Sequence, residues 1–162
     1  MSPATPEKQL AEFIDKFAPD VAALIRAARR KLRERLPHAT ELVYDNYNFL
    51  VIGYGPSERP SDAILSLAAQ AKGVSLCFLQ GAALPDPNRI LRGSGNKVRN
   101  VRLDSIATLD QPEVRAMIDV ALERAKVPMD PGGKRRLIIR SISPKQRPRR
   151  VIAAKSGRRA VR

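Results

Sequence analysis

Residues 41–81 read ELVYDNYNFLVIGYGPSERPSDAILSLAAQAKGVSLCFLQG, and this stretch decides the fold. Residues 47–52 alternate between two faces in steps of two, which is typical of a β-strand. Residues 63–69 and 74–79 form two further runs of strand character, joined by a short link at 71–73 that suits a hairpin. Asp45-Asn46 predicts a tight turn or a bulge. The stretch therefore predicts a sheet built mainly from neighbouring strands.

Downstream of this stretch, residues 98–103 predict another strand and residues 137–142 predict a last strand at an edge of the sheet. The long segment 84–97 between them predicts a loop, with one helical turn at residues 87–91. The sheet should thus contain five to six strands.

Three amphipathic helices flank the strands. The first begins with Thr5 as its cap and Pro6 in its first turn, followed by apolar residues at helical spacing. The second runs from Pro19 to about Leu36. The third is predicted to be capped by Asp110, and its buried stripe continues to residue 125.

These elements predict an α+β fold, a two-layer sandwich in which two to three helices cover one face of an antiparallel sheet. Residues 1–142 should form a single domain. Residues 143–162 are rich in Pro, Ser, Lys and Arg and should form a basic, disordered tail. The second face of the sheet should be at least partly open to solvent, where a site could form.

The charge of the chain is concentrated at its C-terminus. The net charge is +14, yet residues 1–133 hold 18 Lys and Arg against 16 Asp and Glu, and residues 134–162 hold 12 Lys and Arg without an acid. No apolar run approaches the ~20 residues needed to span a bilayer, and no secretion signal is evident, so we expect a cytoplasmic protein without membrane insertion. Cys77 is the only cysteine and predicts a buried, inert thiol.

The turn-rich segments supply the candidate ligand-binding residues. Two tyrosines and two asparagines lie together at residues 44–48, where side chains can stack and donate hydrogen bonds, unless the segment is simply a hairpin that satisfies its own backbone. The loops 53–62 and 92–97 add basic groups that could bind an anion or could serve only as constrained loops. The resulting candidates are Tyr44, Asn46, Tyr47, Arg59, Lys97 and Arg99.

Two sets of basic residues could bind nucleic acid. The second helix carries an arginine stripe at residues 26–33, which could contact phosphates, although such a stripe is more often only a solvated face. The tail could contact phosphates without reading sequence, since it lacks aromatic side chains for stacking. Its candidate residues are Lys145, Arg147, Arg149, Arg150, Arg158 and Arg159.

No catalytic triad, metal-ligand spacing or phosphate-binding loop can be read from the chain, which favours a non-enzymatic role. The strings ELVYDNYNFLVIGYGPSERPSDAI, VSLCFLQGAALPDPNRILRGSGNKVRNVRL and KRRLIIRSISPKQRPRR resemble the bacterial YdhG-like family, a domain family of unknown function. Some of its members are described as frataxin-like iron chaperones with an α+β sandwich, which deliver iron to iron–sulfur or haem assembly proteins.

The resemblance implies an iron-binding protein, and frataxin-like proteins bind iron along an acidic ridge on the first helix and first strand. The candidate metal ligands in this chain are then Glu12 and Asp15. Three functions remain open: iron binding and delivery, binding of a small anionic metabolite, and a nucleic-acid accessory role through the tail. Each is a hypothesis about binding rather than catalysis.

Overall fold

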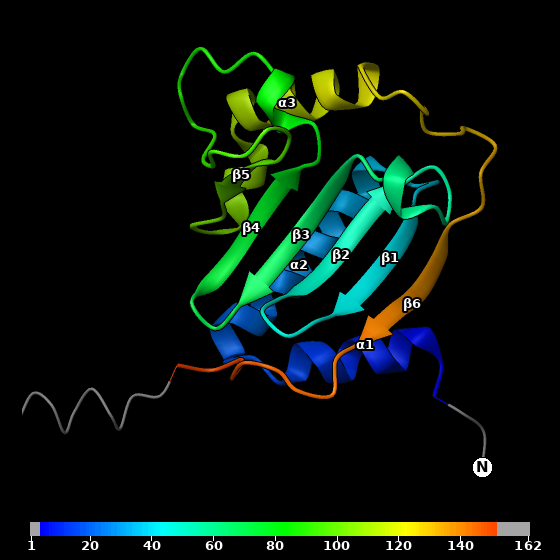
Figure 1. Ribbon diagram of the computed structural model, residues 1–162, viewed down its shortest axis with the longest axis vertical. Coiled ribbons are helices and arrows are strands. Elements are labelled where there is room, and N and C mark those ends of the chain that lie inside the picture. The colour runs from blue at the N-terminus through cyan, green and yellow to red at the C-terminus, as the bar shows by residue number, and fades with distance from the viewer. Residues whose placement is uncertain (1–3, 152–162) are drawn as a thin grey trace, which may run out of the picture.

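The computed structural model describes residues 4–151, which form three α-helices and one six-stranded sheet (Figure 1). The helices are α1 (Pro6–Asp15), α2 (Pro19–Arg35) and α3 (Pro112–Glu123). The strands are β1 (Thr40–Asp45), β2 (Leu50–Gly55), β3 (Leu65–Gln70), β4 (Gly73–Phe78), β5 (Arg99–Arg102) and β6 (Arg136–Ile142). Three short 3₁₀ helices lie in the connections: η1 (Pro60–Asp62), η2 (Gly81–Ala83) and η3 (Ile106–Asp110). The predicted α+β class and the predicted numbers of helices and strands are confirmed.

The sheet has the strand order β5-β4-β3-β2-β1-β6. Strands β1 to β5 form an antiparallel meander, as expected from the short links between them. Strand β6 instead pairs in parallel with β1, so the sheet is mixed and the prediction of a wholly antiparallel sheet is wrong at this edge. The reason is the connection: after α3 the chain passes along one end of the sheet and enters β6 at the end where β1 begins (Figure 1).

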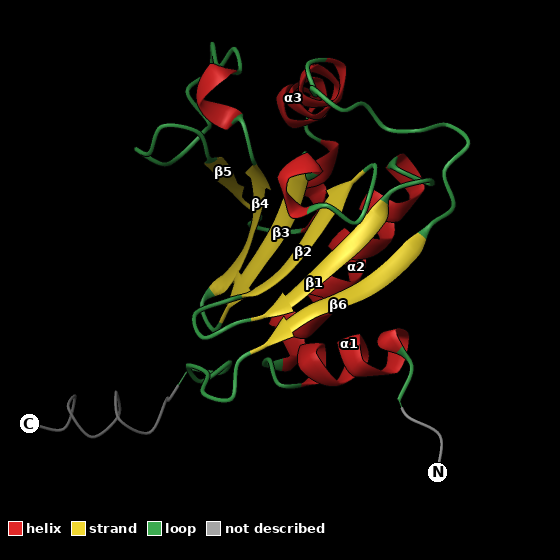
Figure 2. Cartoon of the chain, turned by 45° about the vertical axis from the view of Figure 1, so that its right-hand side comes forward, coloured by secondary structure: helices red, strands yellow, loops and turns green. Residues whose placement is uncertain are grey.

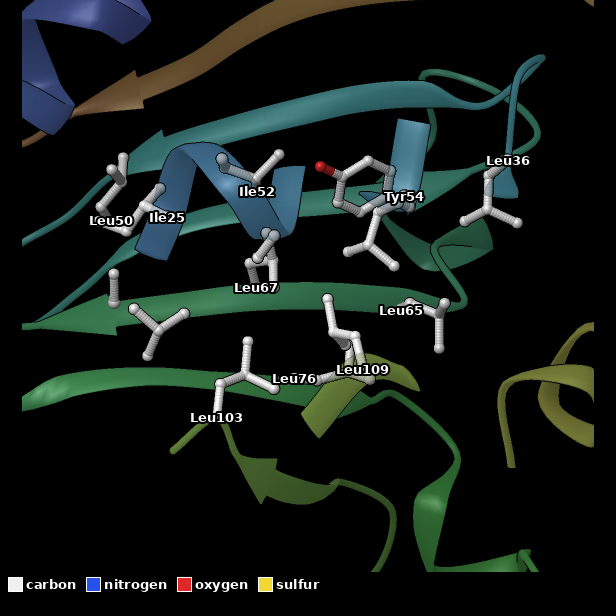
Figure 3. Packing of buried hydrophobic residues seen from close by; sticks show 14 of the residues in the cluster. Ile25, Leu36, Leu50, Ile52, Tyr54, Leu65, Leu67, Leu76, Leu103 and Leu109 are labelled. Atoms are coloured by element: carbon white, nitrogen blue, oxygen red, sulfur yellow. The ribbon is translucent and has the colours of Figure 1, made fainter. Parts of the chain in front are cut away.

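One face of the sheet carries the core. Helix α2 lies behind the sheet in Figure 1, α1 lies beside β6, and α3 lies at the end where β2 and β4 finish. Alternate residues of β2, β3 and β4 point toward α2 and are nearly inaccessible to solvent, including Ile52, Leu67 and Leu76 (Figure 3). Each such side chain contributes about 1.5–3 kcal/mol by leaving water. Within residues 4–151, no α-helix covers the opposite face, which Figure 1 presents to the viewer.

Two predicted local features differ in the structure. Asp110 ends η3 and binds Lys31 at 2.8 Å, while Gln111 occupies the position that precedes α3. Residues 87–88 form a single hydrogen-bonded turn, closed by a bond from Arg89 N to Asp86 O at 3.1 Å. The turn does not continue to residue 91, where the Asp86 carboxylate instead accepts hydrogen bonds from the backbone N–H groups of Ile90 and Leu91. In both places an aspartate binds a partner that the sequence does not identify.

Residues 143–151, which the sequence assigned to a disordered tail, follow a defined path across the end of β1 and beside α1 (Figure 2). The backbone of this segment is held by hydrogen bonds from Ser143 N to Asp45 O and from Arg147 N to Tyr47 O, both 2.9 Å. We call residues 143–151 the C-terminal arm. The remainder of the predicted tail, residues 152–162, lies outside the described residues.

Candidate functional site

The structure places the six candidate ligand-binding residues at two opposite ends of the sheet. Tyr44, Asn46 and Tyr47 lie where β1 turns into β2. Arg59 precedes η1 and Lys97 lies before β5, both at the other end (Figure 1). These side chains therefore do not form one site, and each end has to be considered by itself.

At the β1–β2 end, the polar residues hold the C-terminal arm and β6. Asn46 accepts a hydrogen bond from Ser141 of β6 at 2.8 Å. The ring of Tyr47 lies beneath the guanidinium group of Arg147, 5.7 Å from ring centroid to carbon. Asn46 and Tyr47 thus bind other parts of the chain, and this end shows a docking site for the arm rather than a ligand cavity.

Asp45 is the centre of this docking site and is fully buried. Its carboxylate binds Lys16 at 2.8 Å and Arg149 at 3.0 Å. Arg149 also donates to the backbone oxygen of Asn46. Burial alone would raise the pKa of Asp45, but the hydrogen bonds from Lys16, Gln146 and Arg149 outweigh it and hold the pKa below its ordinary value.

A second buried carboxylate, Glu41, lies on the same face of β1. It accepts two hydrogen bonds of 2.9 Å from Arg29 and one from the hydroxyl of Tyr54, also 2.9 Å. Burial lowers the pKa of Arg29, but the hydrogen bonds to Glu41 and Glu7 raise it by a larger amount. The pKa is therefore above its ordinary value, and the guanidinium stays charged. The bonds from Arg29 to Glu41 connect α2 to the sheet.

The other end of the sheet contains a cavity with a volume of about 600 Å³. We call it the α3 pocket, because the C-terminal end of α3 forms one wall and the segments around η1 and η2 form the others. Its apolar lining is Ile64, Phe78, Leu84, Ala121, Ala125 and Val127, and its polar lining includes Asp62, Gln80, Lys97, Arg124 and Lys126.

Local contacts fix the walls of the α3 pocket. Asp62 is held by the hydroxyl of Ser57 at 2.8 Å, and Arg124 donates to the backbone oxygen of Ala83 at 2.9 Å, which joins α3 to η2. Gly81 packs so closely on β5 that an added Cβ would lie 2.5 Å from the Cβ of Arg99. Hydrogen bonds and close packing therefore connect α3, η2 and β5, the elements around the pocket.

The charge of the α3 pocket is positive. Lys97, Arg124 and Lys126 line it against the single carboxylate of Asp62. Among the candidate residues only Lys97 lines this pocket; Arg99 instead donates to the backbone oxygens of Gly95 and Val98. Sequence reasoning missed Arg124 and Lys126, which lie on either side of the last residue of the predicted α3 stripe, Ala125.

The two candidate metal ligands do not form a metal site. Glu12 and Asp15 are both exposed on α1, and Asp15 forms an ion pair with Arg26 of α2. Across residues 4–151 there is no group of three or more His, Cys, Asp or Glu side chains arranged to hold a metal ion. The donor set therefore does not fit iron, which favours clustered carboxylates.

The nucleic-acid candidates of the tail divide into two groups. Arg149 is only 5% exposed and binds Asp45, so it is a structural residue. Lys145, Arg147 and Arg150 are exposed, although Arg150 also donates to the backbone oxygen of Lys16. Arg158 and Arg159 lie outside the described residues.

Within residues 4–151, no helix combines the length and the apolar character needed to cross a lipid bilayer. Comparison of the chain with models of protein families, with curated proteins and with solved structures returns no match.

Proposed function

We propose that this protein is a non-enzymatic binding protein for a small organic anion with an apolar body, and that the ligand occupies the α3 pocket. The observation that carries the proposal is the combination of an apolar lining around Phe78 with the three cations Lys97, Arg124 and Lys126 in one cavity. The proposal develops the metabolite-binding hypothesis and keeps one of its residues, Lys97.

The size and chemistry of the pocket support this ligand class. A volume of about 600 Å³ falls in the range of roughly 300–1,000 Å³ that is usual for small-molecule sites. Such sites combine apolar walls, which supply affinity, with a few polar groups that fix orientation. An apolar body would lie against Ile64 and Phe78, and a carboxylate or sulfonate would lie near Lys97 and Lys126.

Iron binding has less support in the geometry. The candidate ligands Glu12 and Asp15 supply two carboxylates, and Arg26 already neutralises one of them. We therefore expect the double variant Glu12→Ala/Asp15→Ala to leave the behaviour of the protein toward ferrous iron unchanged. If the wild-type protein binds ferrous iron saturably and this double variant does not, the iron chaperone role would be favoured over anion binding.

The proposal is tested with 1-anilinonaphthalene-8-sulfonate, an apolar organic anion whose binding is measured by calorimetry. We expect one molecule to bind per chain. Lys97→Gln should weaken binding about three- to tenfold, since a hydrogen bond to a charged group contributes on the order of 1 kcal/mol or more. Ala125→Trp should abolish binding, because Ala125 lines the pocket just after α3 and an indole at this position would fill it.

The matched control is Arg140→Gln, which removes the same charge from β6, far from the pocket. It should leave the affinity unchanged. Equal losses in Lys97→Gln and Arg140→Gln would show non-specific attraction to the net charge and would refute the proposal, as would full affinity in Ala125→Trp. Native mass spectrometry of protein purified gently from its host then identifies the natural ligand by its added mass.

A further inference from the structure

A second cavity lies between α1 and α2 and is lined by arginines. Its volume is about 440 Å³, and we call it the arginine groove. Four of its arginines come from α2 and the fifth comes from the segment before β6. They are Arg26, Arg29, Arg30, Arg33 and Arg135.

The α2 arginines converge because of their spacing. Positions 26, 29, 30 and 33 are related by three, four and seven residues, so the helix presents them on one face. This face turns toward α1. The stripe seen in the sequence therefore lines a surface groove, in which Arg26 and Arg30 remain exposed and Arg29 and Arg33 are partly buried.

One anion already occupies this groove, and it belongs to the protein. The carboxylate of Glu7 accepts hydrogen bonds from both terminal nitrogens of Arg29, at 2.7 and 3.1 Å, and lies 3.8 Å from Arg33. Glu7 is 55% exposed, so it can leave without opening the core. The groove thus shows how an oxyanion binds there, with two parallel bonds from one guanidinium.

The groove retains donors that the protein does not use. The Nε of Arg33 is buried and has no hydrogen-bond partner, and its nearest carboxylates, Glu7 and Glu41, are both 3.8 Å from its guanidinium. Arg30 is exposed and forms no ion pair within residues 4–151. The Nε of Arg33 faces the buried Glu41, whereas its Nη1 faces Glu7, so Nη1 and the guanidinium of Arg30 are the donors that a ligand taking the place of Glu7 would meet.

The charge of the groove selects the ligand. Its five arginines face four carboxylates, those of Glu7, Glu34, the buried Glu41 and Asp15, so one positive charge remains, and a second is exposed when Glu7 leaves. Guanidinium groups match phosphate oxygens in pairs, and several guanidinium groups together favour more than one phosphate. No aromatic side chain lines the groove, so a nucleobase finds no stacking surface there.

We propose that the arginine groove binds the phosphates of a compact polyphosphate compound, and that the ligand displaces Glu7 from Arg29 and Arg33. Arg29 remains bound to Glu41 through its other hydrogen bonds and so keeps α2 on the sheet. The exchange moves one surface carboxylate and breaks no buried pair. This site is distinct from the α3 pocket and does not depend on the function proposed for that pocket.

The test is calorimetric titration with inorganic pyrophosphate at low salt. Arg30→Gln and Arg33→Gln should each weaken binding about tenfold, because each removes a charged donor. Glu7→Gln should tighten binding several-fold, because it removes the competing carboxylate. Arg140→Gln is the control of equal charge outside the groove and should leave the affinity unchanged.

Three results would overturn the proposal. The first is no saturable binding of pyrophosphate by the folded wild-type protein. The second is unchanged affinity in Arg30→Gln, an exposed position whose substitution leaves the fold intact. The third is that a 20-base-pair DNA duplex binds more tightly than pyrophosphate and that Arg30→Gln and Arg33→Gln abolish this binding. That result would identify a nucleic-acid surface instead. Lys97→Gln separates the two proposals, since it should weaken binding in the α3 pocket alone.

Discussion

At the scale of single residues, the acidic residues Glu41 and Asp45 show how β1 is bound to the helical layer. They are four residues apart in the strand, so both point to the face that carries the core. Each is buried and each meets an arginine from another element: Arg29 of α2 for Glu41, and Arg149 of the C-terminal arm for Asp45. Buried carboxylates of this kind are strongly destabilising once a partner is lost.

We predict that Asp45→Asn lowers the free energy of unfolding by about 3–5 kcal/mol, because Arg149 is then buried without its carboxylate. Arg149→Met should cost somewhat less, since Lys16 still binds Asp45. The double variant should lose less than the sum of the two single losses, by at least about 1 kcal/mol. Urea unfolding of the four proteins measures this coupling, and strictly additive losses would contradict it.

The same residues show what the sequence could not predict. A charged residue in a strand is usually solvated, so Glu41 and Asp45 gave no sign that they face inward. Their partners are 12 and 104 residues away in the chain, and only the folded chain brings them together. The sequence identified Lys97 as a candidate because basic residues in a glycine-containing loop suggest an anion site. Arg124 lines the same pocket, but in the sequence it resembled an ordinary charged residue at the end of a helix.

At the scale of elements, the helices were predictable and the sheet edge was not. Pro6, Pro19 and Pro112 mark the starts of α1, α2 and α3, and the apolar spacing fixes the faces that they bury. The parallel pairing of β6 with β1 depends on the path of the whole connection 124–135, whose turn at Asp130–Gly133 does not indicate which strand β6 will join. The C-terminal arm was missed for a similar reason, because its composition resembles that of a disordered segment.

Truncation of the chain tests the role of the C-terminal arm. A protein ending at Ser143 should unfold at a clearly lower temperature than the full chain, because Asp45 loses both Gln146 and Arg149. A protein ending at Val151 keeps these contacts and is the matched control. Thermal unfolding followed by circular dichroism compares them; equal midpoints for the two truncations would show that the arm contributes nothing.

This result bears on nucleic-acid binding by the tail. Removal of residues 143–162 would destroy the arm together with the basic groups, so loss of binding in that protein would not identify the binding residues. Substitution of the exposed Lys145, with Arg147 and Arg149 retained, separates charge from folding.

At the scale of the whole molecule, the shifted pKa values predict a window of pH in which the fold is most stable. Asp45 and Glu7 have pKa values below their ordinary 3.8 and 4.5. Burial raises the Asp45 value, but the bonds from Lys16 and Arg149 outweigh it, and a hydrogen bond from Arg29 lowers the Glu7 value. Their stabilisation is present above these ordinary values and is lost as the pH falls through the lower values of the folded state.

At the alkaline end the sign is reversed. Burial raises the pKa values of Cys77 and Tyr54, and the charge of Glu41 adds to the effect at Tyr54. The unfolded chain then loses these protons first, so stability falls above about pH 9. We predict a plateau between roughly pH 5 and 8 in urea unfolding, and a shallower acidic decline in Asp45→Asn. An acidic decline as steep in that variant as in the wild type would contradict the assignment.

The pairing of β6 with β1 has a consequence for synthesis on the ribosome. Residues 40–45 emerge early, but their parallel neighbour, residues 136–142, and the arginine that neutralises Asp45 emerge about a hundred residues later. Until then β1 is an edge strand with one side unpaired, and the Asp45 carboxylate lacks Arg149. An unpaired strand edge of this kind can pair with a strand of another chain. Final closure of the sheet must therefore follow translation of nearly the whole chain, and this interval is when a chaperone would matter most to this protein.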